Sequence, residues 1–420
     1  MEKHTVNESR PSTLVWASLE ERFRQQVQSM LQELLEEEVT EFLGRVKSER
    51  RPAGATAGTA AAASRNGHGK PRQLSTGLGT LTVQRPRVRG LEERFESRVL
   101  PLFARRTAAV DDLLPQLYLH GLAAGDFDLA LRGLLGEEAP LSPSTMLRLK
   151  SRWQGEYEAW NQRSLSEEEV VYLWADGIYV KAGLEKEKAC LLVVVAALAD
   201  GRKVLLAVQS GYRESTESWA ALLRDLKRRG MNSPRLVIAD GNLGLWAALA
   251  QVYPEAGEQR CWNHRIVNVL DQVPEKRKGA AQVWLQQMMY AETREKAGEL
   301  KGKFATWCDK YQCGAAARRL EEDWERLVAY YDFPQAHWIH LRTTNPVESP
   351  FAAARLRTSA AKRFKRVENA TAMLWKLLRV AETRFRKVNA PELMATVAAG
   401  ARYENGRLQR PEVREERIAA

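Results

Sequence analysis

The sequence has no long apolar run and few cysteines, and both absences narrow the classes of protein it can encode. Its densest apolar stretch, residues 190–199, is far shorter than the roughly 20 residues that a membrane-spanning helix needs. The N-terminus lacks the apolar segment of a signal peptide. Four cysteines in 420 residues are too few and too scattered for a disulfide framework. We therefore expect a cytoplasmic protein with reduced cysteines and no membrane partner.

Positive charge, in contrast, is plentiful and concentrated. The net charge is +11. Residues 45–106 hold 14 Lys and Arg against 4 Asp and Glu, and residues 355–387 hold 11 against 2. Two concentrated patches favour a nucleic-acid partner over charge that serves only solubility.

The first quarter of the chain reads as a helix, a linker and a strand. Apolar residues at helical spacing predict an amphipathic helix over residues 14–47, which packs either on its own domain or on a second copy. Residues 52–71 are rich in Ala, Gly, Thr and Ser and predict a flexible linker. The alternating residues 79–89 predict a strand with an Arg-rich edge, which either follows a phosphate backbone or is an ordinary charged face.

Residues 108–162 predict three helices joined by short turns. Ser142-Pro143 opens the third, with serine as cap and proline at the first helical position. This helix carries Arg148, Lys150 and Arg152 in its first half. Two helices followed by a basic helix give the outline of a helix-turn-helix, although a three-helix bundle would read the same way. We predict that these three cations contact DNA.

From residue 170 the pattern changes to short apolar runs typical of buried strands. The predicted order is β-β-β-α-β-α-β, with strands at residues 170–176, 189–199, 204–208, 235–240 and 258–262, and helices at 215–229 and 242–252. Helical periodicity continues through residues 263–335 and returns at 368–388, whereas the polar residues 400–420 are expected to fray.

Two aspartates end predicted strands. Asp176 and Asp240 each follow an apolar run and precede a glycine. Asp200 also precedes glycine, but there a hairpin turn between two strands is reason enough. The helix between the other two strands makes them parallel neighbours. Their carboxylates are then expected to converge on an oxygen-ligand site suited to Mg²⁺ or Mn²⁺.

A third acid opens a short helix near a basic segment. Glu348 follows Asn345-Pro346, and a proline at the start of a helix would direct it toward the strand ends. The segment behind it either follows a DNA backbone or is a solvated helix end. Its cations are Arg355, Arg357, Lys362 and Arg363.

Cys261 and His264 form a Cys-x-x-His pair at the end of the last predicted strand. As a zinc site the pair would need more ligands; otherwise it is structural. The side chains available for zinc are Cys308, Cys313, His337 and His340.

Taken together, these motifs resemble the Mutator-type family of bacterial insertion-sequence transposases, the insertion sequence 256 group. The resemblance covers most of the chain, and its matching segments are residues 35–43, 173–176, 237–241, 260–264 and 344–349 with Arg355 and Arg357. It implies an RNase H-like fold whose Asp-Asp-Glu triad, Asp176, Asp240 and Glu348, is catalytic and holds two Mg²⁺ or Mn²⁺ ions. Such ions, about 3.5–4 Å apart, activate water or a 3′-hydroxyl for attack on a phosphodiester. It also implies that Cys261 and His264 are a structural pair beside this site.

We therefore predict an α/β RNase H-like catalytic core with a large all-α insertion, preceded by a mostly helical DNA-binding region. The predicted parts are an N-terminal helical or dimerisation segment (1–50), a flexible linker (51–78), a DNA-binding region with helix-turn-helix-like helices (79–165), the core (166–262), the helical insertion (263–340), the catalytic Glu helix (341–365) and a C-terminal helix and tail (366–420).

The implied function is binding of terminal inverted repeats, metal-dependent strand cleavage and strand transfer into target DNA. Two DNA ends must be held together, so we expect at least a homodimer, in the bacterial cytoplasm at the nucleoid. The alternatives are an inactive DNA-binding protein on the same fold, such as a domesticated repressor, and a nuclease that cleaves without joining. Further predicted DNA contacts are Arg342, Asn345, Arg355, Arg357, Lys362 and Arg363.

Overall fold

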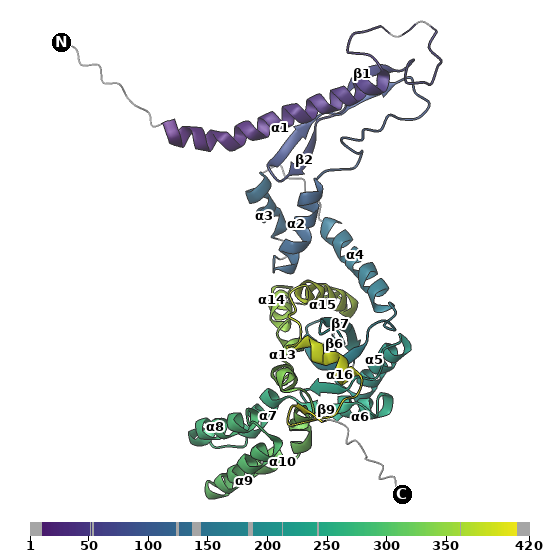
Figure 1. The fold of residues 1–420 in the computed structure, drawn as a ribbon. Helices are drawn as coiled ribbons and strands as arrows, with labels where there is room; N and C mark the ends of the chain where they lie inside the picture. The colour runs from purple at the N-terminus through teal and green to yellow at the C-terminus, as the bar shows by residue number, and fades with distance from the viewer. Residues whose placement is uncertain are drawn as a thin grey trace, which may run out of the picture. The chain divides into compact units, whose positions relative to one another are not determined.

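The computed structural model of the chain describes residues 11–50, 52, 54–122, 126–136, 144–183, 188–211, 213–241, 243–361 and 363–409. The chain divides into two compact units, Met1–Leu149 and Lys150–Ala420. Figure 1 labels the elements of each.

The first unit combines one long helix with two small sheets. Helix α1 (Pro11–Leu43) buries Leu35, Val39 and Leu43 against the strands. It therefore packs on its own unit, which is one of the two options that the sequence left open. The strands form two antiparallel pairs, β1 (Ser64–His68) with β4 (Pro86–Arg89) and β2 (Arg72–Thr76) with β3 (Gly79–Val83).

Two predictions for this unit are wrong. The expected linker (51–78) contains the whole of β1 and β2, because pairing with β4 and β3 orders polar residues that carry no strand signal of their own. The single strand expected over residues 79–89 is two strands of different sheets. It breaks before Pro86, which has no N–H to give to a continuous ladder.

Helix α1 also covers the free edge of β3 with glutamine side chains. Gln28 accepts a hydrogen bond from the Thr82 N–H (2.9 Å). Gln32 accepts from the Gln84 N–H (3.0 Å) and donates to its carbonyl (2.8 Å). Side-chain amides thus take the place of a neighbouring strand.

Three helices follow, as predicted: α2 (Ala108–Leu119), α3 (Phe127–Leu135) and α4 (Ser144–Asn161). Tyr118 and Phe127 are buried with ring centroids 6.1 Å apart, so α2 and α3 pack together. The division between the two units falls within α4. The expected start of this helix at Ser142-Pro143 lies outside the described residues.

The second unit is built on a mixed five-stranded sheet, as the sequence predicted for its α/β part. Its order is β7-β6-β5-β8-β9; β6 runs antiparallel to both its neighbours, whereas β5, β8 and β9 are parallel. The strands are β5 (Val170–Val180), β6 (Ala189–Leu198), β7 (Lys203–Gly211), β8 (Leu236–Ala239) and β9 (Gly257–Arg260).

One face of this sheet carries helices α5 (Thr216–Arg228) and α6 (Leu243–Val252) over the main hydrophobic core. Ser215 caps α5 by accepting a hydrogen bond from the Ser218 N–H. The other face is covered by later segments. There the Trp174 indole donates to the His340 carbonyl (3.0 Å), and the Tyr172 hydroxyl lies 2.7 Å from His337 Nδ1.

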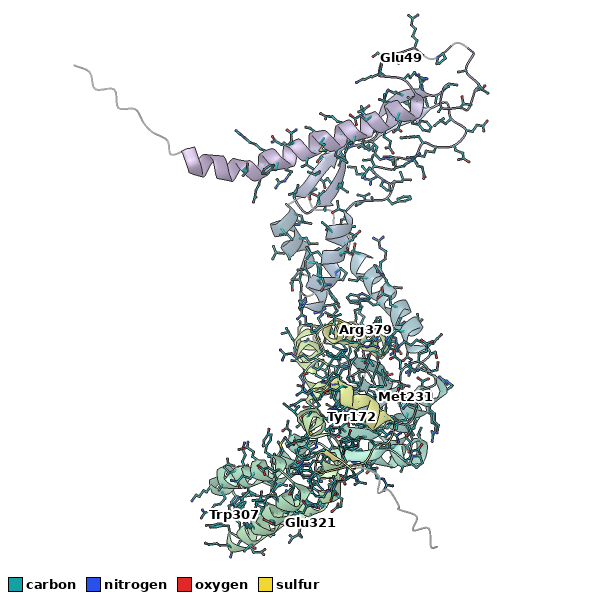
Figure 2. The ribbon with its side chains drawn as sticks, in the orientation of Figure 1. Glu49, Tyr172, Met231, Trp307, Glu321 and Arg379 are labelled. Carbon is teal, nitrogen blue, oxygen red and sulfur yellow. The ribbon has the colours of Figure 1, made fainter. Side chains whose placement is uncertain are left out.

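A long helical region separates β9 from the segment of Glu348, as predicted. Within the second unit, Figure 1 shows α8–α10 extending away from the sheet, and Figure 2 shows Trp307 and Glu321 there. Its elements are α7 (Trp262–Leu270), η1 (Glu275–Arg277), α8 (Lys278–Met289), α9 (Arg294–Lys310), α10 (Gly314–Glu321), α11 (Trp324–Leu327), η2 (Ala329–Asp332), η3 (Gln335–His337) and α12 (Trp338–Leu341).

The C-terminal segment is more ordered than expected. Residues 403–408 form a hairpin that docks through Gly406, whose N–H donates to Tyr331 and whose carbonyl accepts from Gln335. Fraying is therefore wrong for these residues. Among the described helices, none has both the length and the apolarity to span a membrane. The elements here are α13 (Asn345–Glu348), α14 (Phe351–Ala361), α15 (Val367–Glu382), η4 (Pro391–Leu393), α16 (Met394–Ala398), β10 (Tyr403–Glu404) and β11 (Arg407–Leu408).

Candidate active site

Strand register brings Asp176 and Asp240 side by side. Ala175 pairs with Ala239 across the parallel strands β5 and β8, and both alanines belong to the core under α5 and α6. Successive side chains in a strand alternate between faces. The residues that follow the two alanines, Asp176 and Asp240, therefore turn to the opposite face. The predicted parallel neighbourhood is thereby confirmed.

The expectation that Asp176 ends its strand is wrong. Strand β5 continues to Val180, and Asp176 pairs with Val193 in the antiparallel ladder with β6. The Asp-Gly signal predicted a break, but hydrogen bonding to a long neighbouring strand carries the chain straight through. Asp176 therefore has strand residues both before and after it in the chain, whereas Asp240 follows the last residue of β8.

Glu348 reaches the same place from helix α13, which packs against β5 and β6. Burial is the main cause that raises the pKa of Asp176 to about 7, followed by the negative charge of Asp240, and Glu348 adds to the rise. The Gly177 N–H, which donates to Asp176 Oδ1 (2.8 Å), opposes it. The structure thus brings together three carboxylates that are distant in sequence, in surroundings that disfavour the charge of Asp176.

Thr344 orients Glu348 and was not singled out from the sequence. Its side chain is fully buried, and its hydroxyl donates a hydrogen bond to Glu348 Oε1. The same hydroxyl lies 3.2 Å from Cys261 Sγ, and the Thr344 N–H donates to that sulfur (3.4 Å). A threonine four residues before an acid, where a helix begins, was the available signal, because positions i and i+4 share a helix face.

Cys261 and His264 lie beside the triad, at the end of β9. The Cys261 N–H donates to the Ala239 carbonyl (2.7 Å), next to Asp240. His264 Nδ1 is 3.8 Å from Glu348 Oε1. The pKa of His264 is raised to about 9, first by its hydrogen bond with Cys261 and also by the charge of Glu348. His264 is therefore a cation at neutral pH.

Only some of the side chains that could bind zinc lie close together in the structure. One atom each of Cys261, His264 and Glu348 lie within 4.8 Å of one another. The further side chains proposed as zinc ligands have other partners. Burial and the neighbouring Cys313 raise the pKa of Cys308, His337 contacts Tyr172, and His340 contacts Asn389. In the described part of the chain, none of those four side chains joins the Cys261 group.

The glycine after each aspartate has a structural reason that the sequence did not reveal. A Cβ on Gly241, whose φ is +93°, would overlap the guanidinium of Arg260. Arg260 is buried, donates to the Gly241 carbonyl (3.0 Å) and pairs with Asp323 (3.0 Å). A Cβ on Gly177 would overlap Glu214, a further acid that approaches β5 from the face opposite Asp176.

Two of the predicted DNA contacts have their side chains engaged within the fold. Arg357 is 1% exposed, so a duplex on the surface cannot reach it. Arg342 directs its guanidinium toward three rings, with distances of 5.0–5.5 Å to the centroids of Tyr290, Tyr330 and Trp338. Spacing in a basic segment identified neither the buried face of α14 nor this aromatic cage.

Three other predicted contacts of this region are exposed, and one lies outside the described residues. Arg355 is exposed on α14, and Arg363 is exposed and donates to the Gly183 carbonyl (2.8 Å). Asn345 is exposed and accepts a hydrogen bond from Asn263 (3.3 Å). Lys362 is the one not described.

On the basic helix α4 the three predicted cations differ in their surroundings. Arg148 is exposed and Lys150 is half-buried. Arg152 is exposed but pairs with Glu156 at 2.8 Å. A role of this helix in DNA binding stays a prediction.

Comparison with known proteins identifies the family. The family described as "Transposase, Mutator family" matches residues 2–387. The transposase for insertion sequence element IS6120 of Mycolicibacterium smegmatis is 47% identical over 304 residues, which cover 72% of this chain and 94% of the relative. The transposase for element IST2 of Acidithiobacillus ferrooxidans is 39% identical over 66% of this chain and 94% of its own length. The transposase for IS256 in transposon Tn4001 of Staphylococcus aureus is 26% identical over 68% and 72%. The chain therefore belongs to the Mutator family of transposases.

Proposed function

We propose that this chain is a metal-dependent DNA transposase whose triad, Asp176, Asp240 and Glu348, cuts the ends of an insertion sequence and joins them to target DNA. The observation that carries the proposal is the convergence of three carboxylates from β5, β8 and α13 on one face of a sheet. The mixed sheet with its central acid supports the RNase H-like assignment that the sequence resemblance implies.

The residues present fit a pair of hard divalent cations. Carboxylate oxygens are the ligands that Mg²⁺ and Mn²⁺ prefer, and the raised pKa of Asp176 marks a place where positive charge would be stabilising. Asp176, Asp240 and Glu348 would hold the ions. When bound, two such ions would polarise the scissile phosphate and activate the attacking oxygen.

The protein's own contribution is to fix the acids before substrate arrives. The β5–β8 register sets the spacing of the aspartates, and the hydroxyl of Thr344 sets the direction of Glu348. Water would break the P–O3′ bond at the element end and release a 3′-hydroxyl. That hydroxyl would then displace a 3′-oxygen from a phosphodiester of the target. Neither step needs a covalent protein intermediate.

The test is a Mg²⁺-dependent assay on terminal-repeat DNA that scores hydrolysis and joining separately. Asp176→Ala and Glu348→Ala should abolish both. Asp200→Ala is the matched control, since Asp200 has the same Ala-Asp-Gly context but sits in the exposed turn between β6 and β7, and it should keep activity. Full activity of Asp176→Ala would exclude the triad. Hydrolysis without joining would favour the nuclease, and repeat binding without either reaction the repressor.

We also propose that the active form is at least a homodimer. Helix α1 leaves Phe23, Met30 and Leu34 exposed beside its packed face, with Phe23 and Met30 one heptad apart, a spacing that suits a second helix. Removing α1 would also remove core residues of its unit, so substitution is the cleaner test. In light scattering, Phe23→Ser with Met30→Ser should lower the mass, and Arg22→Ser should not. An unchanged mass in both would exclude this interface.

A further inference from the structure

A pocket of about 260 Å³ opens where the two small sheets of the first unit meet. Its walls come from β1, β2 and β4, the links between the strands, and the segment after β4. None of its described lining residues is acidic. Five carry positive charge: Lys70, Arg72, Arg85, Arg87 and Arg94.

Two of these cations, Arg72 and Arg85, are partly buried. Arg72 donates through Nη1 to the Leu102 carbonyl (2.6 Å) and through Nη2 to that of Pro101 (3.1 Å). The pKa of Arg72 is lowered by burial and by the nearby charges of Arg85 and Arg105. The Nε atoms of Arg72 and Arg85 are both buried, and neither has a hydrogen-bond partner in the described structure. Two like charges, each with an unused donor, thus lie beside one cavity, and one of them is held by backbone carbonyls.

The other three cations, Lys70, Arg87 and Arg94, are exposed around it. Two cations elsewhere in the unit, in contrast, are paired with acids of the protein. Arg65 pairs with Glu36 (3.3 Å), and Arg106 pairs with Asp111 (2.6 Å). The lining of the pocket is therefore a concentration of positive charge that a bound anion would balance.

We propose that this pocket holds a backbone phosphate of duplex DNA, with the exposed cations reaching its neighbours along the strand. Guanidinium groups match the oxygens of a phosphate in number and geometry. Five cations beside a single amide, Asn66, suit contacts that position DNA rather than contacts that read its sequence. The choice of DNA as the polyanion rests on the proposed function; the anion site rests on the pocket itself. The site is separate from the contacts predicted on α4.

The experiment measures binding of the full-length protein to a fluorescent duplex in EDTA, so the acid centre plays no part. The test variant is Arg87→Gln with Arg94→Gln. The matched control is Arg89→Gln with Arg98→Gln, which removes the same charge from exposed residues that do not line the pocket. Affinity is followed from about 50 to about 200 mM salt, because each lost phosphate contact lowers the slope of log K against log salt by about 0.9.

We expect the pocket variant to bind roughly tenfold more weakly at the higher salt, with a slope lower by about 1–2. The loss should be equal for terminal-repeat and scrambled duplexes, and the lysine variants Arg87→Lys with Arg94→Lys should restore the slope. The control should lose less than about threefold. Unchanged melting temperatures confirm that the variants fold.

Equal losses in the pocket variant and its control would overturn the proposal, since net charge alone would then explain them. So would a loss confined to the repeat sequence, or tighter binding of a phosphoserine peptide than of DNA. If the wild-type protein binds no duplex at all, the proposed function fails as well. If the wild-type protein binds DNA and the pocket variant shows an unchanged slope, only the proposal for the pocket fails.

Discussion

The acid centre of the second unit and the basic pocket of the first unit are opposite solutions to the same electrostatic problem. Each gathers charge of one sign where burial makes that charge costly. Burial and neighbouring groups of like charge raise the pKa of Asp176 and lower that of Arg72. Both shifts favour the neutral form of the side chain. Each cluster would therefore be stabilised by a partner of opposite charge.

The two clusters differ in how firmly the fold holds them. Asp176 sits in the middle of a five-stranded sheet with a large core beneath it, which suits a reaction that tolerates little displacement. The basic pocket lies between two-stranded sheets, and most of its cations are exposed. That arrangement suits attraction to a repeating polyanion, which needs charge more than exact placement.

The largest expected effect comes from neutralising the acid centre. Asp176→Asn should lower strand cleavage by at least about a thousandfold, since lost metal stabilisation of several kcal/mol acts on the transition state. The same variant should be more stable than the wild type in EDTA at pH 8, by on the order of 4 kcal/mol. The folded-state pKa of Asp176 is about 7 and lies above that of an unfolded aspartate. Wild-type stability is therefore lost as pH rises from about 4 to about 7.

Denaturant unfolding at several pH values checks this difference. Asp200→Asn is the control, because the pKa of Asp200 is lowered by its contacts with Arg202, although burial opposes the shift, and its contribution has the opposite sign. If Asp176→Asn is no more stable than the wild type above pH 7, ionisation of Asp176 does not destabilise the folded protein, and the acid centre does not carry the expected electrostatic cost.

Removal of a proton from Asp176 should accompany metal binding. Below its pKa of about 7, Mn²⁺ affinity should rise up to about tenfold per pH unit and then level off. Calorimetry in two buffers of different ionisation enthalpy measures the proton released. Affinity that stays constant between pH 5.5 and 8 would contradict this expectation.

A smaller effect should follow from releasing Glu348 without removing its charge. Thr344→Val takes away the hydroxyl that donates to Glu348 and should reduce cleavage by about 10–100-fold, as is usual for residues that orient metal ligands. Thr344→Ser keeps the hydroxyl and should stay near wild type. A raised Mn²⁺ requirement with an unchanged melting temperature would separate orientation from folding. Equal activity in the valine and serine variants would exclude a role of the Thr344 hydroxyl in orienting Glu348.

The smallest effect should appear at the basic pocket. Inorganic phosphate at about ten times its dissociation constant should stabilise the first unit by roughly 1.4 kcal/mol. Arg85→Gln should weaken this effect, because Arg85 lines the pocket. Arg89→Gln should leave it intact. Thermal unfolding with phosphate and with chloride at matched ionic strength gives the comparison, and equal stabilisation of both variants would contradict an anion site.

Sequence patterns predicted the second unit better than the first, for a physical reason. Long apolar strands and amphipathic helices have strong periodic signals, and the helix expected between them predicted that the strands of Asp176 and Asp240 are parallel neighbours, as they are. Strands β1 and β2 are short and polar, and they exist because of their pairing partners. No local pattern carries that information.

Within the site, sequence identified the acids but not what surrounds them. The carboxylates belong to recognisable sequence motifs, whereas the role of Thr344 depends on a contact with Cys261, 83 positions earlier in the chain. The burial of Arg357 depends in the same way on how α14 packs. Charge counts along the chain do not distinguish a cation in the core from one at the surface.

The glutamine side chains of α1 have a consequence for how the chain behaves while it folds. An uncovered strand edge is a template on which another chain can add a strand. Gln28 and Gln32 occupy the backbone groups at the edge of β3, so α1 acts as a guard against intermolecular sheet growth. Because α1 precedes β3 in the chain, the glutamines that cover this edge are already synthesised when β3 emerges.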